Sequence, residues 1–258
     1  MKYTIDDLRS IMTRLRGENG CPWDRVQTHQ SIKRSMIEEA YEAIDALDAN
    51  DDKMFANELG DVLFQVIFHS ALAEERGAFN FDDVVGEICQ KLIDRHTHVF
   101  GDDKATDEAS ALGMWEKNKK AEKGLKTYTD TLKDVPKNFP ALIRAEKVQK
   151  KAKAAGFDWD SADGAFAKLY EEIDEVKQAV SEQNKEKISE EFGDLLFAAV
   201  NVGRFIDADP EQSLTNATNK FIKRFEKLEQ LAKERGTELD DLNLEQMDEL
   251  WNEIKKSE

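Results

Sequence analysis

Two short stretches decide the fold: Glu171-Glu172-Ile173-Asp174-Glu175 and Glu191-Phe192-Gly193-Asp194-Leu195-Leu196-Phe197. Both have a counterpart in the first half of the chain, Glu38-Glu39-Ala40-Tyr41-Glu42 and Glu58-Leu59-Gly60-Asp61-Val62-Leu63-Phe64, at the same interval and with no gap. When residues 38–64 are aligned with 171–197, nine positions are identical, and four of the nine are glutamate. The sequence therefore predicts two copies of one structural unit.

Apolar spacing predicts that these units are helical. Apolar residues recur every three or four positions, as in Phe221, Phe225 and Leu228, and no β-branched alternation bounded by turns is present. The expected helices span 5–17, 29–49, 52–76, 81–98, 107–122, 140–154, 161–183, 185–206, 211–234 and 243–256. Residues 124–139 show no sustained period. We therefore expect an all-α fold with tandem repeats at 1–123 and 140–258, joined by a linker at 124–139.

Composition limits the possible partners. The chain has 258 residues, of which 40% are hydrophobic, enough to form a core, and its formal net charge is −17. That charge argues against a nucleic acid polymer as a partner, but a divalent cation can still bridge carboxylates to a nucleotide's phosphates. No apolar run approaches the roughly 20 residues that a membrane helix needs, and two cysteines suit a reducing compartment. We expect a cytoplasmic protein without a membrane partner.

Helix geometry predicts that the repeated carboxylates lie close together. Glu172 and Glu175 share one helix face, as do Glu191 and Asp194 on the next helix, because side chains three apart lie together. The short connection between these helices predicts an antiparallel hairpin, so the four carboxylates converge and need a cation. Oxygen ligands of this kind favour Mg²⁺, with Mn²⁺ as a substitute. The matching quartet of the first repeat is Glu39, Glu42, Glu58 and Asp61.

A glutamate-rich helix can also be no more than a solvated face. Three features favour the metal site: the pattern occurs twice, the intervals are identical, and a glycine follows the glutamate in both copies. Glycine inside a helix costs about 1 kcal/mol relative to alanine. Gly60 and Gly193 are therefore expected to permit close approach of another helix or of a ligand.

The motif EExxE followed by ExxD resembles the signature of the all-α nucleoside triphosphate pyrophosphohydrolase family in its tandem-repeat form. The similarity covers essentially the whole chain and includes Gly20–Asp24, Arg95–Gly101, Arg144–Lys151 and Gly156–Trp159. It implies Mg²⁺-dependent cleavage of NTPs and dNTPs between the α- and β-phosphates, giving NMP and pyrophosphate. It further implies a role in nucleotide-pool housecleaning or a stress response, and a homodimer whose four-helix units pair across subunits.

The resemblance also assigns residues in the second repeat. It makes Glu172, Glu175, Glu191 and Asp194 the Mg²⁺ ligands. The nucleotide-binding positions that it implies are Lys168, Leu169, Tyr170, Glu171, Glu172, Lys187, Ile188, Ser189, Glu190, Asp194, Lys220, Phe221, Ile222, Lys223, Arg224 and Trp251. The cations suit a polyphosphate and Trp251 offers a flat face to a base, although the lysines could be merely solvated and Trp251 a core anchor.

The sequence lacks a G-x-x-x-x-G-K-[ST] loop and indicates no nucleophile constellation of the Ser-His-Asp or Cys-His type. Hydrolysis would then use a water molecule, with Mg²⁺ polarising the phosphate oxygens and Glu171 or Glu190 as the candidate base. The second repeat should carry most of the activity, because Lys168, Lys187 and Glu190 correspond to Ser35, Met54 and Asn57 in the first. Two alternatives stay open: a nucleotide-sensing helical module with weak turnover, or two active repeats with different nucleotide preferences.

Overall fold

The computed structural model describes residues 2–257, and over this range the chain is helical, with no strand. The α-helices are α1 (Ile5–Arg16), α2 (Pro22–Val26), α3 (Ser35–Asp48), α4 (Asp52–Glu75), α5 (Phe81–Arg95), α6 (Thr97–Phe100), α7 (Glu108–Glu122), α8 (Tyr128–Lys133), α9 (Ala141–Lys153), α10 (Ala162–Ser181), α11 (Lys185–Phe205), α12 (Pro210–Glu234) and α13 (Leu244–Lys256). A short 3₁₀ turn, η1 (Leu239–Asp241), precedes α13. None of the helices in this range is long and apolar enough to span a bilayer. The all-α prediction is confirmed.

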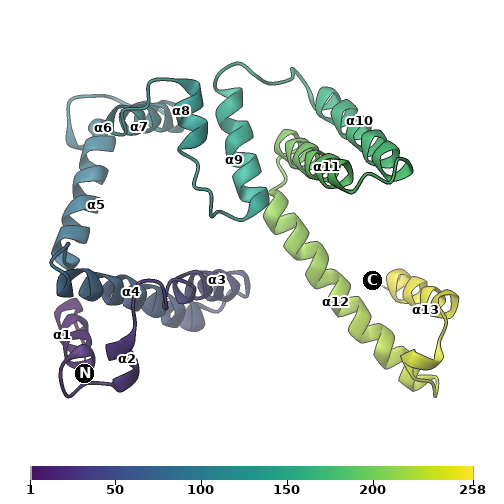
Figure 1. The fold of residues 1–258 in the computed structure, drawn as a ribbon, viewed down its shortest axis with the longest axis horizontal. Coiled ribbons are helices and arrows are strands. Elements are labelled where there is room, and N and C mark those ends of the chain that lie inside the picture. Colours follow the sequence, from purple (N-terminus) through teal and green to yellow (C-terminus); the bar gives the residue numbers. More distant parts are fainter. Residues whose placement is uncertain (1, 258) are drawn as a thin grey trace. The chain divides into compact units, whose positions relative to one another are not determined.

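The chain divides into two compact units, one ending at Ala121 and the other beginning at Glu122. In the first unit, α3 packs along α4, and α4 also contacts α1 and α5 (Figure 1). Its core is formed by Met12 of α1, Ile32 of the following turns, and Ile67, Phe68 and Leu72 of α4. This core sits at the end of α4 away from the α3–α4 loop, so the carboxylates near the start of α4 lie outside it.

The second unit repeats the central hairpin. Helices α10 and α11 pack along their lengths, and α9 contacts both α11 and α12 (Figure 1). A separate apolar cluster joins the end of α12 to α13, built from Leu228, Ala232, Leu250 and Ile254. Each repeat thus contributes one helical hairpin with its carboxylates on facing helices.

The two hairpin loops confirm the repeat at the level of backbone geometry. Asn50 and Gln183 occupy corresponding positions of the two repeats, and both have a φ of 54°, in the left-handed region. The next residue caps the following helix in each case: the side chain of Asp51 accepts from backbone amides of α4, and that of Asn184 from α11. Because a left-handed residue followed by an N-cap reverses the chain sharply, both predicted antiparallel hairpins form.

Three regions of the first repeat depart from the sequence-based expectation. The helix expected over 29–49 begins only at Ser35, because Ser31 and Thr28 hydrogen-bond each other's backbone and hold this stretch in turns. The helix expected over 81–98 breaks at His96, whose Nδ1 lies 2.7 Å from the carbonyl oxygen of Leu92. Helix α2 was not expected at all.

Part of the expected linker at 124–139 forms a helix. It contains α8, which Thr127 and Asp130 start with reciprocal side-chain-to-backbone hydrogen bonds. Thr131 and Val135 are buried there, and α8 packs against α9. The stretch is too short to show a helical period, which is why its sequence resembles a linker.

Candidate metal centres

The second repeat brings three of its predicted metal ligands together. Glu172 and Glu175 of α10 and Glu191 of α11 each place a carboxylate oxygen within 4.8 Å of the others. Glu172 is only 4% exposed, and its Oε2 is buried without a hydrogen-bond partner. Asp194, the fourth predicted ligand, is exposed and lies outside this group. Its ligand role stays a prediction.

Lys168 supplies a positive charge inside this cluster. Its Nζ lies 2.7 Å from Oε1 of Glu172 and 2.7 Å from Oε1 of Glu171. These two hydrogen bonds raise the pKa of Lys168 above its usual range. The pKa of Glu175 is also raised, chiefly because its carboxyl group lies within hydrogen-bonding reach of Glu172, and further by burial and by the charges of Glu172 and Glu191. The carboxylates of Glu172, Glu175 and Glu191 therefore repel one another even though Lys168 pairs with Glu172.

The first repeat gathers a slightly different trio. Carboxylate oxygens of Glu39, Glu58 and Asp61 lie within 4.8 Å of one another, and Glu58 is 8% exposed. Burial raises the pKa of Glu39, as do the negative charges of Asp61, Glu42 and Glu58, while its hydrogen bond from Gln65 acts in the opposite direction. Glu42, although predicted as a ligand, lies outside this trio.

Two side-chain amides contact the first cluster. Nε2 of Gln65 donates to Glu39 at 3.4 Å, and Nδ2 of Asn57 donates to Glu58 at 3.3 Å and to Asp61 at 3.4 Å. Sequence reasoning missed Gln65, although its position four residues after Asp61 places it on the same helix face. The two centres thus differ in kind: a lysine contacts one, and neutral amides contact the other.

No other helix of the described chain lies close to the two helix glycines. A Cβ built at Gly60 or Gly193 would meet nothing within 4 Å, so a close helix contact within the described residues is absent, and close approach of a ligand stays a prediction. Both glycines instead lie on open faces beside exposed apolar side chains, Leu59 and Leu63 in α4, Phe192 and Leu196 in α11.

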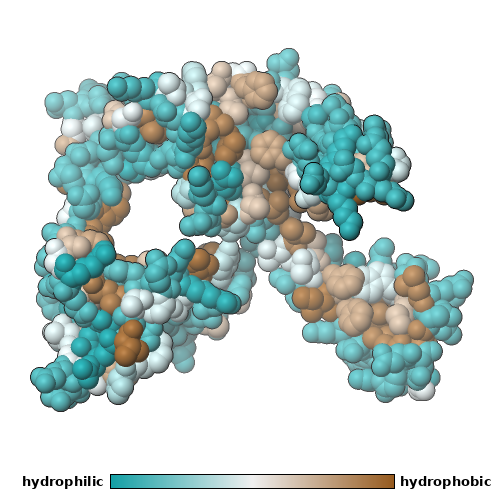
Figure 2. Space-filling model, in the orientation of Figure 1, coloured by the Kyte–Doolittle hydropathy of each residue, from teal (hydrophilic) through white to brown (hydrophobic). Residues whose placement is uncertain are grey.

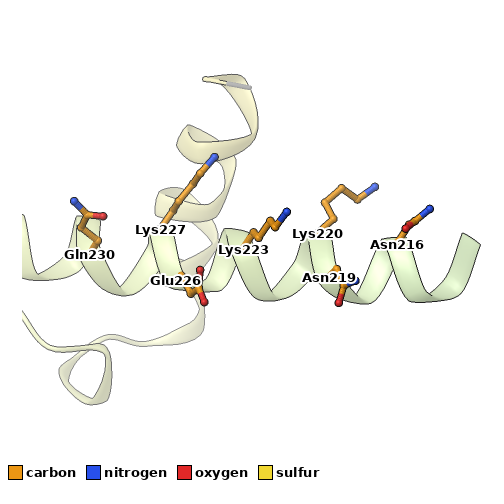
Figure 3. A pocket seen from close by; sticks show the side chains of 7 residues that line it. All are labelled: Asn216, Asn219, Lys220, Lys223, Glu226, Lys227 and Gln230. Carbon is orange, nitrogen blue, oxygen red and sulfur yellow. The ribbon is translucent and has the colours of Figure 1, made fainter. Parts of the chain in front are cut away.

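The remaining predicted nucleotide contacts lie on four helices, with Leu169 and Tyr170 on α10 and the others on α11, α12 and α13. Lys187 is near the start of α11, with its Nζ 3.4 Å from Glu182. Along α12, Lys220 and Lys223 line one open pocket, and Figure 3 shows them directed to the same side of the helix as Lys227. Trp251 packs against Phe221, with ring centroids 5.1 Å apart, beside the α12–α13 apolar cluster. No carboxylate of the metal trio lines the α12 pocket.

Both carboxylate clusters fit a divalent metal ion. They offer only oxygen ligands, the donor type of Mg²⁺, Mn²⁺ and Ca²⁺ rather than of zinc. The buried, unpartnered Oε2 of Glu172 is an acceptor for which the protein supplies no donor, and such an atom is costly unless a cation or a water satisfies it. The residues of both clusters therefore suit a cation, and the buried Oε2 of Glu172 is the atom that most needs one.

The fold and the two acidic clusters define an all-α protein with two tandem helical hairpins, each of which brings together carboxylates suited to a divalent cation. The chain matches the family described as the MazG nucleotide pyrophosphohydrolase domain twice, over residues 27–100 and 161–229. It belongs to this family, with one copy of the domain in each repeat, and is an enzyme of the nucleotide pyrophosphohydrolase type.

Full-length relatives support the assignment. The nucleoside triphosphate pyrophosphohydrolase/pyrophosphatase MazG of Thermotoga maritima is 44% identical over 97% of this chain and 95% of its own length. The nucleoside triphosphate pyrophosphohydrolase of Escherichia coli K12 is also 44% identical, over 98% of both chains. The protein YabN of Bacillus subtilis is 49% identical over 99% of this chain but only 52% of its own length. The similarity therefore extends over nearly the whole length of two relatives and over about half of a third.

Removing the metal should lower the melting temperature. A ligand that binds only the folded state adds about 2.7 kcal/mol when its concentration is 100 times its dissociation constant. We expect several millimolar Mg²⁺ to raise the melting temperature relative to EDTA, measured by differential scanning calorimetry. A double variant, Glu39→Gln with Glu172→Gln, should lose most of this shift. Equal melting temperatures for the wild type in both buffers would contradict the metal centres.

Proposed function

We propose that this protein hydrolyses nucleoside triphosphates and deoxynucleoside triphosphates between the α- and β-phosphates, releasing NMP and pyrophosphate, with Mg²⁺ as the metal ion. The observation that carries this proposal is the trio of Glu172, Glu175 and Glu191, with Lys168 forming an ion pair with Glu172. The carboxylates suit a metal ion that also binds phosphate oxygens, and the lysine suits the phosphates themselves. A role in nucleotide-pool housecleaning or a stress response follows from this activity as part of the proposal.

We assign a separate role in the proposed reaction to each group of residues. Glu172, Glu175 and Glu191 would hold the metal ion, which would supply charge to offset and orient the phosphates of the triphosphate. Lys168, together with Lys187 and the lysines of α12, neutralises charge that develops on the departing pyrophosphate. Glu171 or Glu190 accepts the proton of the attacking water, and both are exposed carboxylates beside the trio in sequence.

Glu171 and Glu190 differ in their surroundings. Lys168 donates to Oε1 of Glu171, and such a contact favours the carboxylate form, which a base requires. Glu190 directly precedes the trio member Glu191 on the solvent-exposed side of α11. Separate Glu171→Gln and Glu190→Gln variants distinguish them, because only loss of the base should remove the acidic limb of the pH–rate profile.

The first repeat is proposed to contribute less turnover. Its trio has a neutral amide, Asn57, at the position that Glu190 occupies in the second repeat. It also has Ser35 where the second repeat has Lys168. An Mg–triphosphate complex keeps a net negative charge, so a centre without Lys168 binds it less well.

A nucleotide panel tests the proposed reaction. Pyrophosphate release should be measured for all eight ordinary NTPs and dNTPs, and for oxidised and deaminated forms, with Mg²⁺ and with EDTA. We expect release for at least part of the panel with Mg²⁺ and none with EDTA. Tight nucleotide binding without release across the whole panel would instead favour the sensing module.

We also propose that the protein is a homodimer. Large apolar side chains are exposed along both hairpins, among them Tyr41 and Ile44 of α3 and Tyr170 of α10. Figure 2 shows hydrophobic residues at the surface rather than confined to the interior. Exposed apolar area on this scale marks an interaction surface, and the open faces at Gly60 and Gly193 leave room for a second copy.

The mass in solution tests the dimer. Light scattering coupled to size-exclusion chromatography should give about twice the chain mass of 29.4 kDa. Because burial of apolar area drives such association, Leu63→Lys and Leu196→Lys together should shift the mass toward one chain. A wild-type mass of one chain at micromolar concentration would contradict the dimer.

A further inference from the structure

Two histidines of the first unit contact each other in a pair that the proposed reaction does not use. Nδ1 of His29, in the turns before α3, lies 2.8 Å from Nδ1 of His69 on α4. The two ring planes differ by only 4°. Because parallel rings in face-to-face contact lie about 3.5–4.0 Å apart, two ring atoms at 2.8 Å place these rings edge to edge. This is the geometry of a hydrogen bond between two imidazoles.

A single proton links the two rings of the His29–His69 pair. In a neutral imidazole one nitrogen donates and the other accepts. The ring that donates through Nδ1 therefore has a bare Nε2, and the ring that accepts at Nδ1 carries its hydrogen on Nε2. Both Nε2 atoms are buried and have no hydrogen-bond partner in the described structure. The Nδ1–Nδ1 contact is thus the one hydrogen bond that each ring makes in the described chain.

Added protons act against this contact. The first would charge the donating ring at its bare Nε2, where no acceptor is present and a buried charge is costly. The second would put hydrogens on both Nδ1 atoms, which face each other across 2.8 Å. Two charged rings would then lie with their centroids 5.1 Å apart and repel each other. The hydrogen bond is lost when both rings are charged.

The pKa of His69 agrees with this geometry. Burial lowers it below the ordinary value of 6.5, and the positive charge of His29 lowers it further. A base whose pKa is lower in the closed form than in the open form takes up protons on opening. Its contribution to stability is therefore full above about pH 6.5 and is lost as the pH falls through the lower, folded pKa.

Charged side chains on the elements around the pair do not change this direction. None of residues 62–73 of α4 is charged apart from His69. Ion pairs engage Arg16 with Glu75, Arg9 with Asp82, Arg34 with Glu38, and Lys91 with Glu87. The other charged groups on α1, α2, the turns, the first part of α3 and the first turn of α5 are Asp6, Asp7, Arg14, Asp24, Arg25, Lys33, Glu39, Glu42 and Asp83. The pKa of His69 is set by burial and by His29.

His69 ends a row of polar side chains along α4. Asp61, Gln65 and His69 follow one another at intervals of four residues, which aligns them along one side of the helix. Asp61 belongs to the first metal trio, Gln65 donates to Glu39 of α3, and His69 contacts the turns that lead into α3. Release of His29 therefore loosens the segment that holds α3, and with it Glu39, against α4.

The second unit has apolar residues at the same positions. At the offset that aligns the two repeats, Gln65 corresponds to Ala198 and His69 to Val202, each only 7% exposed. All four histidines of the chain lie in the first unit, and histidine is the side chain whose ordinary pKa lies between about pH 5 and 8. The second hairpin therefore has no counterpart of the His29–His69 pair.

We propose that the His29–His69 pair is a pH-sensitive contact that opens the first repeat in mild acid while the second repeat stays closed. Opening means release of residues 27–34 and of the start of α3 from α4. The first metal centre then loses the fixed position of Glu39, whereas the second keeps its trio. The two repeats of one chain thus respond differently to a fall in pH, whatever reaction they perform.

Hydrogen–deuterium exchange followed by mass spectrometry tests the proposal on the full chain with Mg²⁺ present. Residues 27–48 report on the pair, and residues 162–181 of α10 are the reference in the same sample. From about pH 7.5 to about pH 5.5, protection of 27–48, corrected for intrinsic exchange, should fall about tenfold more than that of the reference. This is the change expected when the open form binds one more proton at a group with a pKa of about 6.5. Because α10 carries ligands of its own trio, loss of metal would affect both segments.

An asparagine variant removes the titration and keeps a hydrogen-bonding group. The amide of asparagine begins one bond beyond Cγ, where histidine has Nδ1, so in His69→Asn it can accept from His29 in neutral and acidic solution. We expect the difference between the two segments to become independent of pH, and His29→Asn should behave in the same way. The matched control is His96→Asn in the same unit, where Nδ1 lies 2.7 Å from the carbonyl oxygen of Leu92. It should keep the wild-type pH dependence.

The direction of the effect separates the His29–His69 pair from the nearby carboxylates. Glu39 and Glu175 have raised pKa values, and their protonation in acid relieves repulsion within each trio, which acts against opening. An equal fall in protection for both segments of the wild type overturns the proposal, and this comparison needs no variant to fold. A wild-type pH dependence in folded His69→Asn or His29→Asn overturns it as well.

Discussion

Glu172→Gln should reduce pyrophosphate release by at least about 100-fold, the order of loss expected when a group that stabilises the reacting charge is removed. Glutamine keeps the size of Glu172 but removes the negative charge of the most buried member of the trio, at 4% exposure. It also exchanges a carboxylate oxygen for an amide group, which cannot hold a divalent ion as well. The measurement is kcat/KM for the best triphosphate of the panel.

The matched control is Glu39→Gln, the same change at the corresponding position of the first repeat. Its cluster contacts two amides in place of Lys168, so we expect it to keep at least about half of the wild-type rate if the second repeat dominates. Circular dichroism should show that both variants are folded. A larger loss from Glu39→Gln would make the first repeat the active one, and equal losses would favour two active repeats.

Asp158→Ala should cost about 3–5 kcal/mol of stability at neutral pH, the range for breaking one side of a buried ion pair. Arg204 is 6% exposed and Asp158 14%, and two arginine nitrogens donate to this carboxylate. Removing Asp158 leaves a buried guanidinium without its counter-ion. Urea unfolding followed by circular dichroism measures the loss, and we expect a lower midpoint for the variant.

At low pH the difference in stability between the wild type and Asp158→Ala should disappear. The hydrogen bonds from Arg204 lower the pKa of Asp158 below its ordinary value of 3.8. A carboxylate with a lowered pKa stabilises the fold above the unfolded pKa and loses that effect as the pH falls through the folded one. The gap between the wild type and Asp158→Ala should therefore be full near pH 7 and shrink below about pH 4.

An exposed ion pair provides the control for Asp158→Ala. Asp174 and Lys177 on α10 are 77% and 70% exposed, and such pairs contribute about 0–1 kcal/mol. Asp174→Ala should accordingly change the urea midpoint little. If Asp158→Ala behaved like Asp174→Ala, the Asp158–Arg204 pair would not anchor the α9–α10 loop to α11.

The repeat made the fold predictable from the sequence. Periodic apolar positions and the doubled carboxylate pattern predicted the long helices and both hairpins, because long amphipathic segments carry a strong periodic signal. Short elements escaped prediction for the opposite reason. Helix α8 spans only Tyr128–Lys133, fewer than two turns, and its start is set by the local cap at Thr127 rather than by a period.

The candidate site was predictable to the level of helix faces. Spacing and the predicted hairpin placed Glu172 and Glu175 near Glu191, and the structure brings these three carboxylates together. Spacing could not show that Glu42 and Asp194 lie outside the trios, because that depends on the rotation of each helix against its partner. Nor could it place the side chain of Gln149 against the backbone of Phe197, because that contact joins α9 to α11, far apart in sequence.

The most direct test of the central claim is phosphorus NMR of a triphosphate incubated with the protein and Mg²⁺. Cleavage between the α- and β-phosphates predicts that the α, β and γ signals of the triphosphate disappear together, while a pyrophosphate signal grows with twice the integrated intensity of the NMP signal. The same sample with Glu172→Gln should stay nearly unchanged. Formation of NDP and orthophosphate, or an unchanged spectrum for the wild type over the whole nucleotide panel, would contradict the account.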